Sequence, residues 1–175
     1  MTFIGSPREA EVNAATHMRS LGFSDARITA AGADGGIDVV ASGAIAQVKW
    51  KAAQTGRPDL QRLVGARGND TGLQLLFYSG TPYSRHAQDY ADTVGMALFT
   101  YNPSGAAQPV NGHARHLVDR SRERRQRQRE LSGREVFEVN PGPGSAIQDE
   151  KRAKVVSVPQ EGLLARLRRA FNGGR

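Results

Sequence analysis

The fold is decided by the stretch Ala31–Lys51, which reads AGADGGIDVVASGAIAQVKWK. Two short apolar runs, residues 37–40 and 44–48, surround Ser42-Gly43, and this pattern predicts a β-hairpin with its turn at that pair. Three polar side chains lie inside or at the edge of these runs, namely Asp38, Gln47 and Lys49. Because polar groups in a buried strand need partners, the hairpin is predicted to carry chemistry as well as part of the core.

Helical and strand patterns alternate around the hairpin. The sequence SPRE at residues 6–9 has the pattern of a capping box with a proline in the first turn, and it predicts a helix that ends at Gly22. Further helices are predicted from Pro58 and from Ser84, and further strands at 26–29, 73–79 and 96–101, the last of the sheet. The order α-β-β-β-α-β-α-β indicates an α/β fold with a mixed sheet flanked by helices.

The composition limits the class of protein. A chain of 175 residues suits one domain with extensions. The absence of cysteine excludes disulfides and thiolate metal sites and favours a reducing compartment. The sequence has neither a signal-peptide pattern nor an apolar stretch near the roughly 18 residues of a membrane helix. A cytoplasmic protein without a membrane span is therefore expected.

The charge is unevenly distributed along the chain. The formal net charge is +7, yet residues 1–112 hold nine Lys/Arg and nine Asp/Glu, whereas residues 113–134 hold eight Arg against three acids. A neutral body with a basic extension suggests a polyanionic partner, nucleic acid first, although ribosomal and membrane-surface proteins share this pattern.

Three segments follow from these patterns. Residues 1–111 are expected to form the folded domain. Residues 112–139 are expected to form an exposed basic helix or a disordered arm that folds on binding. Residues 140–175 hold a linker, NPGPGS, and a short basic amphipathic helix, GLLARLRRAF.

The polar residues of the hairpin are expected to meet. Gln47 and Lys49 are two positions apart in a strand and project to the same side. Asp38 lies on the preceding arm, where cross-strand neighbours come within about 5 Å. Glu11 occupies the apolar face of the first helix, four residues before Ala15, and a carboxylate there expects a partner. The four side chains are therefore predicted to form one polar pocket.

This set of groups suits phosphodiester hydrolysis. Mg²⁺ typically takes only one or two carboxylates, and it activates a water and neutralises charge on the phosphate. Lys49 would orient that water or stabilise the charge on the phosphoryl oxygens. The expected cofactor is Mg²⁺, with Mn²⁺ as an alternative, and the candidate ligands are Asp38, Glu11, Gln47 and the backbone carbonyl of Val48.

The segments AEVNAATHMRSLGF, GADGGIDVV and IAQVKW together resemble the catalytic domain of the Mrr-like restriction endonucleases. These enzymes belong to the PD-(D/E)xK nuclease superfamily, in a branch where Gln replaces the acid of the last motif. The resemblance covers residues 8–105 and implies a restriction-endonuclease-like core. It matches Asp38 to the metal-binding aspartate, Gln47 and Lys49 to the (D/E)xK element, and Glu11 to the glutamate of the first helix.

The resemblance implies an endonuclease that acts on double-stranded DNA in restriction or defence, with a homodimer as an expectation. A DNA-binding module with weak or lost catalysis, or a junction-resolving or repair nuclease, are the alternatives. The candidate DNA contacts are Lys51, Arg57, Arg62, Ser84, Arg85, Arg122, Arg124, Arg125, Arg127 and Arg129. Ser84 suits a helix cap equally well, and an arginine run is often only a solvated face.

Overall fold

The computed structural model describes residues 4–30, 36–50, 53–102 and 104–137, with side-chain surroundings as far as residue 132. All these residues belong to one unit, Met1–Glu138. The boundary expected at residue 111 falls inside this unit. The linker and the amphipathic helix expected within residues 140–175 lie outside the described residues, as does Lys51.

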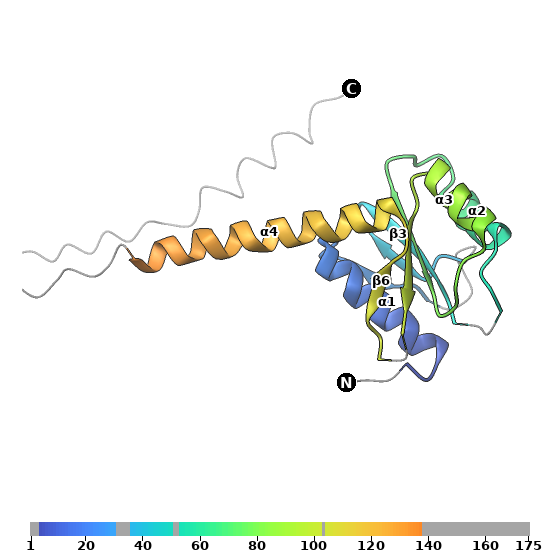
Figure 1. Ribbon diagram of the computed structural model, residues 1–175, viewed down its shortest axis with the longest axis horizontal. Coiled ribbons are helices and arrows are strands. Elements are labelled where there is room, and N and C mark those ends of the chain that lie inside the picture. The colour runs from blue at the N-terminus through green and yellow to red at the C-terminus, as the bar shows by residue number, and fades with distance from the viewer. Residues whose placement is uncertain (1–3, 31–35, 51–52, 103, 138–175) are drawn as a thin grey trace, which may run out of the picture. The chain divides into compact units, whose positions relative to one another are not determined.

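A mixed six-stranded sheet forms the centre of the fold, with its strands in chain order (Figure 1). The strands are β1 (Arg27–Ile28), β2 (Val39–Ala41), β3 (Ala44–Lys49), β4 (Gln74–Ser79), β5 (Ala97–Tyr101) and β6 (Ala107–Pro109). The hairpin β2–β3 is antiparallel, β3, β4 and β5 are parallel to one another, and β1 and β6 are antiparallel edge strands. The predicted α/β architecture with a mixed sheet is confirmed.

The prediction that residues 96–101 form the last strand is wrong, because β6 pairs antiparallel with β5. β6 has only three residues and contains Pro109, which has no N–H to donate to a ladder. Proline is tolerated in an edge strand, but in a sequence it is typical of a turn. The pairing with β5 decides the structure of this segment, and periodicity could not show it.

Four helices cover the sheet, namely α1 (Pro7–Leu21), α2 (Arg57–Arg67), α3 (Arg85–Thr93) and α4 (Gly112–Phe137). The Ser6 hydroxyl accepts from Glu9 N–H at 3.2 Å, as predicted, whereas the Glu9 carboxylate accepts from Gly5 N–H at 2.7 Å, one residue before the expected donor. Gly22 ends α1 in the left-handed region, with φ +110°.

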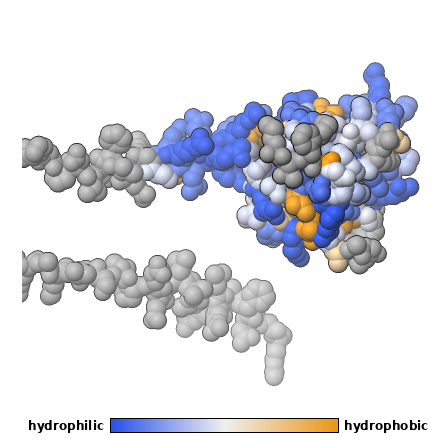
Figure 2. All heavy atoms as spheres, turned by 90° about the horizontal axis from the view of Figure 1, so that it is seen from below, coloured by the Kyte–Doolittle hydropathy of each residue, from blue (hydrophilic) through white to orange (hydrophobic). Residues whose placement is uncertain are grey.

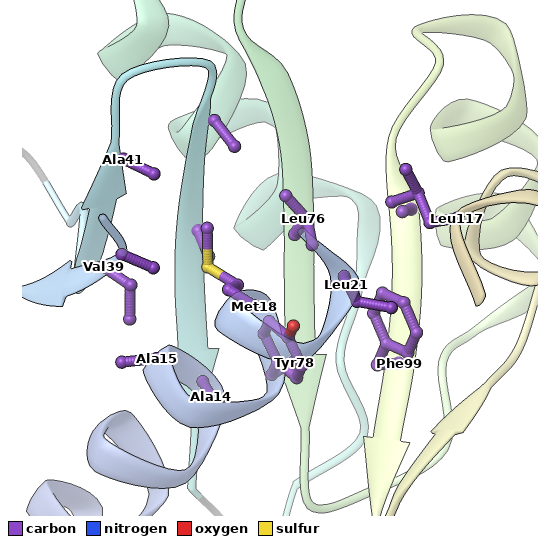
Figure 3. Packing of buried hydrophobic residues seen from close by; sticks show 14 of the residues in the cluster. Ala14, Ala15, Met18, Leu21, Val39, Ala41, Leu76, Tyr78, Phe99 and Leu117 are labelled. Carbon is purple, nitrogen blue, oxygen red and sulfur yellow. The ribbon is translucent and has the colours of Figure 1, made fainter. Parts of the chain in front are cut away.

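The two faces of the sheet carry separate core clusters. On one face, α1 packs Ala14, Met18 and Leu21 against the hairpin and the parallel strands (Figure 3). On the other face, Leu60 and Leu63 of α2 and two alanines of α3 pack against Phe77 and its neighbours. β4 contributes to both clusters, which confirms the prediction of a strand covered on both sides.

α4 is a continuous helix rather than a disordered arm. Asn111 holds its start, since its Oδ1 accepts from the N–H groups of Leu98 and Ala114, both at 3.1 Å. Ala114 and Leu117 are core residues, so the first turns of α4 belong to the domain. Beyond these turns the helix runs past the sheet (Figure 1), and Figure 2 shows that stretch as almost entirely hydrophilic on the face in view.

His17 in α1 is enclosed by aromatic side chains. Its Nδ1 lies 2.9 Å from the Tyr78 hydroxyl, and its ring makes edge contacts with the rings of Tyr78 and Phe99. Burial, assisted by the charge of Arg125, lowers the pKa of His17 from 6.5 to about 4. The imidazole is therefore neutral in the folded protein near neutral pH.

We expect acid to destabilise the fold through His17. Between pH 6.5 and about 4 the unfolded chain binds a proton that the folded chain excludes, so the free energy of unfolding falls as the pH falls. The expected loss at pH 5 is about 2 kcal/mol, measured by denaturant unfolding at pH 7.5 and 5. His17→Gln keeps an acceptor for Tyr78 and should flatten this dependence, whereas the exposed control His86→Gln should keep it. An equal slope in both variants would contradict the assignment.

Candidate active site

Asp38 lies where β2 separates from β3. Its N–H donates to Ala46 O at 2.9 Å, and its carbonyl accepts from Thr29 N–H at 3.0 Å, so its backbone is held on both sides. The carboxylate Oδ2 accepts from Val48 N–H at 2.7 Å. Within the described residues Oδ1 makes no hydrogen bond. One carboxylate oxygen thus takes the place of a strand partner for β3, and the other is available to a ligand.

The carboxyl group of Asp38 feels charges of both signs. Burial raises its pKa, and the Glu11 carboxylate adds to that rise, while Val48 N–H and the Lys49 ammonium lower it. Charges act on each other in this way only at short range in water. The structure therefore brings Asp38 near both Glu11 and Lys49. A divalent cation would relieve the repulsion between the two carboxylates.

Gln47 carries an unpartnered polar atom into the interior. The residue is 4% exposed, and its Oε1 has no hydrogen-bond partner in the part of the chain that the structure describes. Gly36, at φ +96°, lies against this amide, since a Cβ there would stand 2.7 Å from Gln47 Nε2. A buried amide oxygen without a donor is unfavourable unless a ligand satisfies it. Gln47 Oε1 is therefore suited to bind a cation or a water.

The four predicted residues approach the strand junction from both faces of the sheet. Gln47 pairs with Phe77, and Lys49 with Ser79, on the face covered by α2 and α3, whereas Glu11 comes from α1 on the opposite face. No hydrogen bond joins Gln47 to the other three among the described residues. Strand alternation explains why these side chains start from different faces, and their convergence into one polar pocket stays a prediction. Asp38 at the strand junction lies between the two groups.

Glu11 and the Val48 carbonyl are positioned by different contacts. Glu11 Oε2 lies 2.8 Å from an Arg8 guanidinium nitrogen, which also contacts Thr29 O at 3.4 Å. Val48 N–H points to Asp38, and in a ladder the N–H and C=O of one residue point to the same neighbour. The Lys49 carbonyl accepts from Gly80 N–H at 3.0 Å on the other side, as this alternation requires. The Val48 carbonyl is thus directed toward the Asp38 side.

The candidate DNA contacts on α2 and α3 lie at the carboxyl edge of the parallel strands, where Lys49 also ends its strand. The loops after β3 and β4 are joined there, because Thr55 N–H donates to Pro82 O at 3.3 Å and Ser84 N–H donates to Thr55 O at 3.0 Å. The helices that start after these loops begin at Arg57 and Arg85. Both arginines and Ser84 are therefore on the same edge as Lys49.

Several of these side chains already have partners. The Arg57 guanidinium lies 4.9 Å from the centre of the Tyr90 ring, and Arg62 pairs with Asp59 at 3.3 Å. The Ser84 hydroxyl caps α3 by accepting from Ala87 N–H at 3.2 Å, which is the alternative role the sequence left open. Arg85 is exposed and free to reach a phosphate.

The arginines of α4 lie at the other end of α1. Arg125 donates to Ser20 O at 2.9 Å, and the Arg124 guanidinium packs against Gly22, where a Cβ would overlap it. Cations are favourable at this end of a helix because of its dipole. The eleven residue steps from Glu11 to the C-cap Gly22 span about 16 Å. The arginine run is therefore distant from Asp38, and two of its members hold α4 against α1.

The remaining candidate arginines of α4 are solvent-facing. Arg122 pairs with Asp119 at 3.5 Å, and both side chains are mostly exposed. The last two candidates are exposed, namely Arg127 and Arg129. Exposed ion pairs contribute little to stability, so these residues are available to a partner.

Two residues near the site were not singled out from the sequence. Arg8 holds Glu11, and its spacing of three residues along the helix could have indicated the pair. Tyr101 ends β5 with a buried hydroxyl that lacks a partner among the described residues. Its spacing of two residues from Phe99 could have placed Tyr101 on the α1 face. The spacing could not have shown which groups of other elements lie near it.

The oxygen atoms present fit a hard divalent cation. Among the described residues no three or more His, Cys, Asp or Glu side chains are grouped to hold a metal ion. The set here is different, with two carboxylates and the unpartnered amide oxygen of Gln47. Mg²⁺ binds with one or two carboxylates and leaves other positions to water and substrate. This fit rests on Asp38, Glu11 and Gln47.

The chain folds into an α/β domain with a mixed sheet between helices. A family model for the Mrr catalytic domain, described as restriction endonuclease, matches residues 5–102. The chain belongs to this family, and its mixed sheet between helices is the restriction-endonuclease-like core that the sequence motifs implied. The protein is thus a nuclease of restriction type, and the substrate class of such enzymes is DNA.

Neither the curated proteins nor the solved structures contain a match to this chain. Over the residues that the structure covers, no helix is long and apolar enough to cross a membrane.

Proposed function

We propose that the chain is a metal-dependent endonuclease that hydrolyses phosphodiester bonds of double-stranded DNA in restriction or defence. The observation that supports this most is the environment of Asp38. Its carboxylate keeps one oxygen unbonded, feels the charges of Glu11 and Lys49, and lies next to the strand that carries the unpartnered Gln47 amide. Two carboxylates without a cation repel each other, so the arrangement favours binding of a cation.

Each residue of the proposed site has a role. Asp38, Glu11, Gln47 Oε1 and the Val48 carbonyl would hold Mg²⁺, or Mn²⁺ as an alternative. When bound, the cation neutralises charge on the phosphate and makes water a better nucleophile. The Val48 N–H fixes the orientation of Asp38. Lys49 would stabilise charge on the phosphoryl oxygens as water adds to phosphorus and the P–O bond to the sugar breaks.

DNA would lie along the carboxyl edge of the parallel strands. Arg57, Ser84 and Arg85 are at that edge, and we propose them with Arg62 and Lys51 as contacts to the backbone. The exposed arginines of α4 would contact phosphates at a second place, beyond the C-terminus of α1. Such contacts position the duplex without reading its sequence, and their contribution falls steeply with salt. A homodimer that cuts both strands belongs to the same proposal.

A cleavage assay with supercoiled plasmid tests this function. We expect nicked and linear products with Mg²⁺ or Mn²⁺, and none with EDTA. Retention of DNA that falls with salt, but no cleavage with any divalent metal, would identify a binding module instead. Faster cleavage of a four-way junction than of a linear duplex would identify a junction-resolving enzyme.

A further inference from the structure

Tyr101 is an enclosed tyrosine with an unused hydroxyl. The residue is 5% exposed, and its Oη has no hydrogen-bond partner in the part of the chain that the structure describes. The other two buried tyrosines in that part differ. Tyr83 donates to Phe77 O and Phe99 O, and Tyr78 shares a hydrogen bond with His17. Since buried hydroxyls are normally hydrogen-bonded, the hydroxyl of Tyr101 is suited to bind a ligand.

The ring of Tyr101 is held at the edge of the sheet that carries Lys49. It stacks on Trp50, with centroids 5.6 Å apart and an interplanar angle of 29°. A Cβ at Gly80 would lie 3.1 Å from the Trp50 ring and 3.6 Å from the Tyr101 ring. Gly80 N–H in turn donates to the Lys49 carbonyl at 3.0 Å. The aromatic pair thus covers the turn that holds the end of β3.

The hydroxyl also lies on the face of the sheet that is covered by α1. Tyr101 lies two residues after Phe99 in β5, so both side chains are on the same face of the sheet. That face is covered by α1, the helix that carries Glu11. Burial raises the pKa of Tyr101 well above its usual value, and the charges of Asp38 and Glu11 raise it further. The hydroxyl is therefore protonated near neutral pH, and it is a hydrogen-bond donor within electrostatic range of two carboxylates, which can only accept when ionised.

We propose that Tyr101 is a positioning residue of the cation site, whose hydroxyl donates to the Asp38–Glu11 carboxylate pair through one water. This inference rests on the proposed function. The carboxylates come from different elements, α1 and the strand junction at Asp38. A donor that reaches both would hold the two carboxylates at a fixed separation, which is what a cation requires.

Tyr101→Phe tests the proposal, because it keeps the ring stacked on Trp50 and removes only the hydroxyl. We expect Mn²⁺ affinity, measured by electron paramagnetic resonance or calorimetry, to fall about tenfold, as for loss of a hydrogen bond to a charged group. Unfolding stability without metal should not fall, because the deleted hydroxyl makes no direct hydrogen bond to the residues that the structure describes. Excess Mn²⁺ should restore most of the cleavage rate.

Tyr78→Phe is the matched control. It removes a buried hydroxyl from the same face, but that hydroxyl is bonded to His17. Its expected pattern is the reverse, with lower stability and unchanged Mn²⁺ affinity. Unchanged affinity in Tyr101→Phe, or an equal loss in both variants, would overturn the role of Tyr101 while wild-type cleavage still supported the proposed function. A wild type that binds Mn²⁺ more tightly than Tyr101→Phe but cuts no DNA would support Tyr101 and sink the proposed function. No Mn²⁺ binding by the wild type would overturn both.

Discussion

Asp38→Asn is expected to reduce DNA cleavage at least a thousandfold, because a metal contributes several kcal/mol to such a transition state and the variant loses the charge that holds it. The amide oxygen of Asn can still accept from Val48 N–H, so β3 keeps its partner. Rates with supercoiled plasmid in Mg²⁺ and in Mn²⁺ measure the loss. Mn²⁺ affinity should fall together with the rate.

The same substitution should leave the fold intact. Burial raises the pKa of Asp38, so its ionised form is less favourable in the folded than in the unfolded chain at neutral pH. Replacing it with a neutral amide should leave the free energy of unfolding unchanged or higher. The control Asp89→Asn changes an exposed acid of α3 and should cut at the wild-type rate. Full cleavage by Asp38→Asn would place the metal site elsewhere.

Lys49→Met is expected to slow cleavage about 100- to 1000-fold, which is the usual effect of removing one group that stabilises transition-state charge. Methionine keeps much of the apolar stem of this half-buried residue, so the fold should persist. In contrast with Asp38→Asn, Mn²⁺ affinity and DNA binding in Ca²⁺ should remain close to wild type. Single-turnover rates at saturating metal separate the chemical step from binding.

Part of the Lys49 effect can pass through Asp38, because the ammonium lowers the pKa of that carboxyl. Mn²⁺ affinity separates the two, because a weakened Asp38 carboxylate would lower it, whereas loss of a cation that acts only on the phosphate would not. The control Arg27→Met removes an exposed cation from β1 and should have no such effect. If Lys49→Met lost metal affinity as fully as Asp38→Asn, Lys49 would be a support for the carboxylates and not a group acting on phosphate.

Local sequence patterns predicted most of the fold. Caps and stops are short-range, so SPRE and Gly22 predicted α1 almost to the residue. The apolar runs on either side of Ser42-Gly43 predicted the hairpin, and its register pairs Val40 with Ile45. Long-range pairing was harder to foresee, because a three-residue strand with a proline has no period of its own. The family could be inferred from the order of the sequence motifs, because each motif lies within a short stretch of the chain.

The candidate site depended on both levels. Residue types alone indicated that Asp38, Gln47 and Lys49 belong to chemistry, because an acid, an amide and an amine are unfavourable in an apolar hairpin. Their arrangement followed from packing. Alternation along β3 turned Gln47 and Lys49 away from α1, and only the separation of β2 from β3 brought Asp38 between them and Glu11.

The sequence by itself determined the mixed α/β sheet, the membership of the restriction endonuclease family and the residues proposed for hydrolysis. Tertiary structure alone decided that Arg124 and Arg125 hold α4 to the end of α1, and that the hydroxyl of Tyr101 is left without a partner among the described residues, within electrostatic range of two carboxylates. The physical reason is separation along the chain. A motif or a cap lies within a few residues, whereas these contacts join segments that only the folded sheet and its helices bring together.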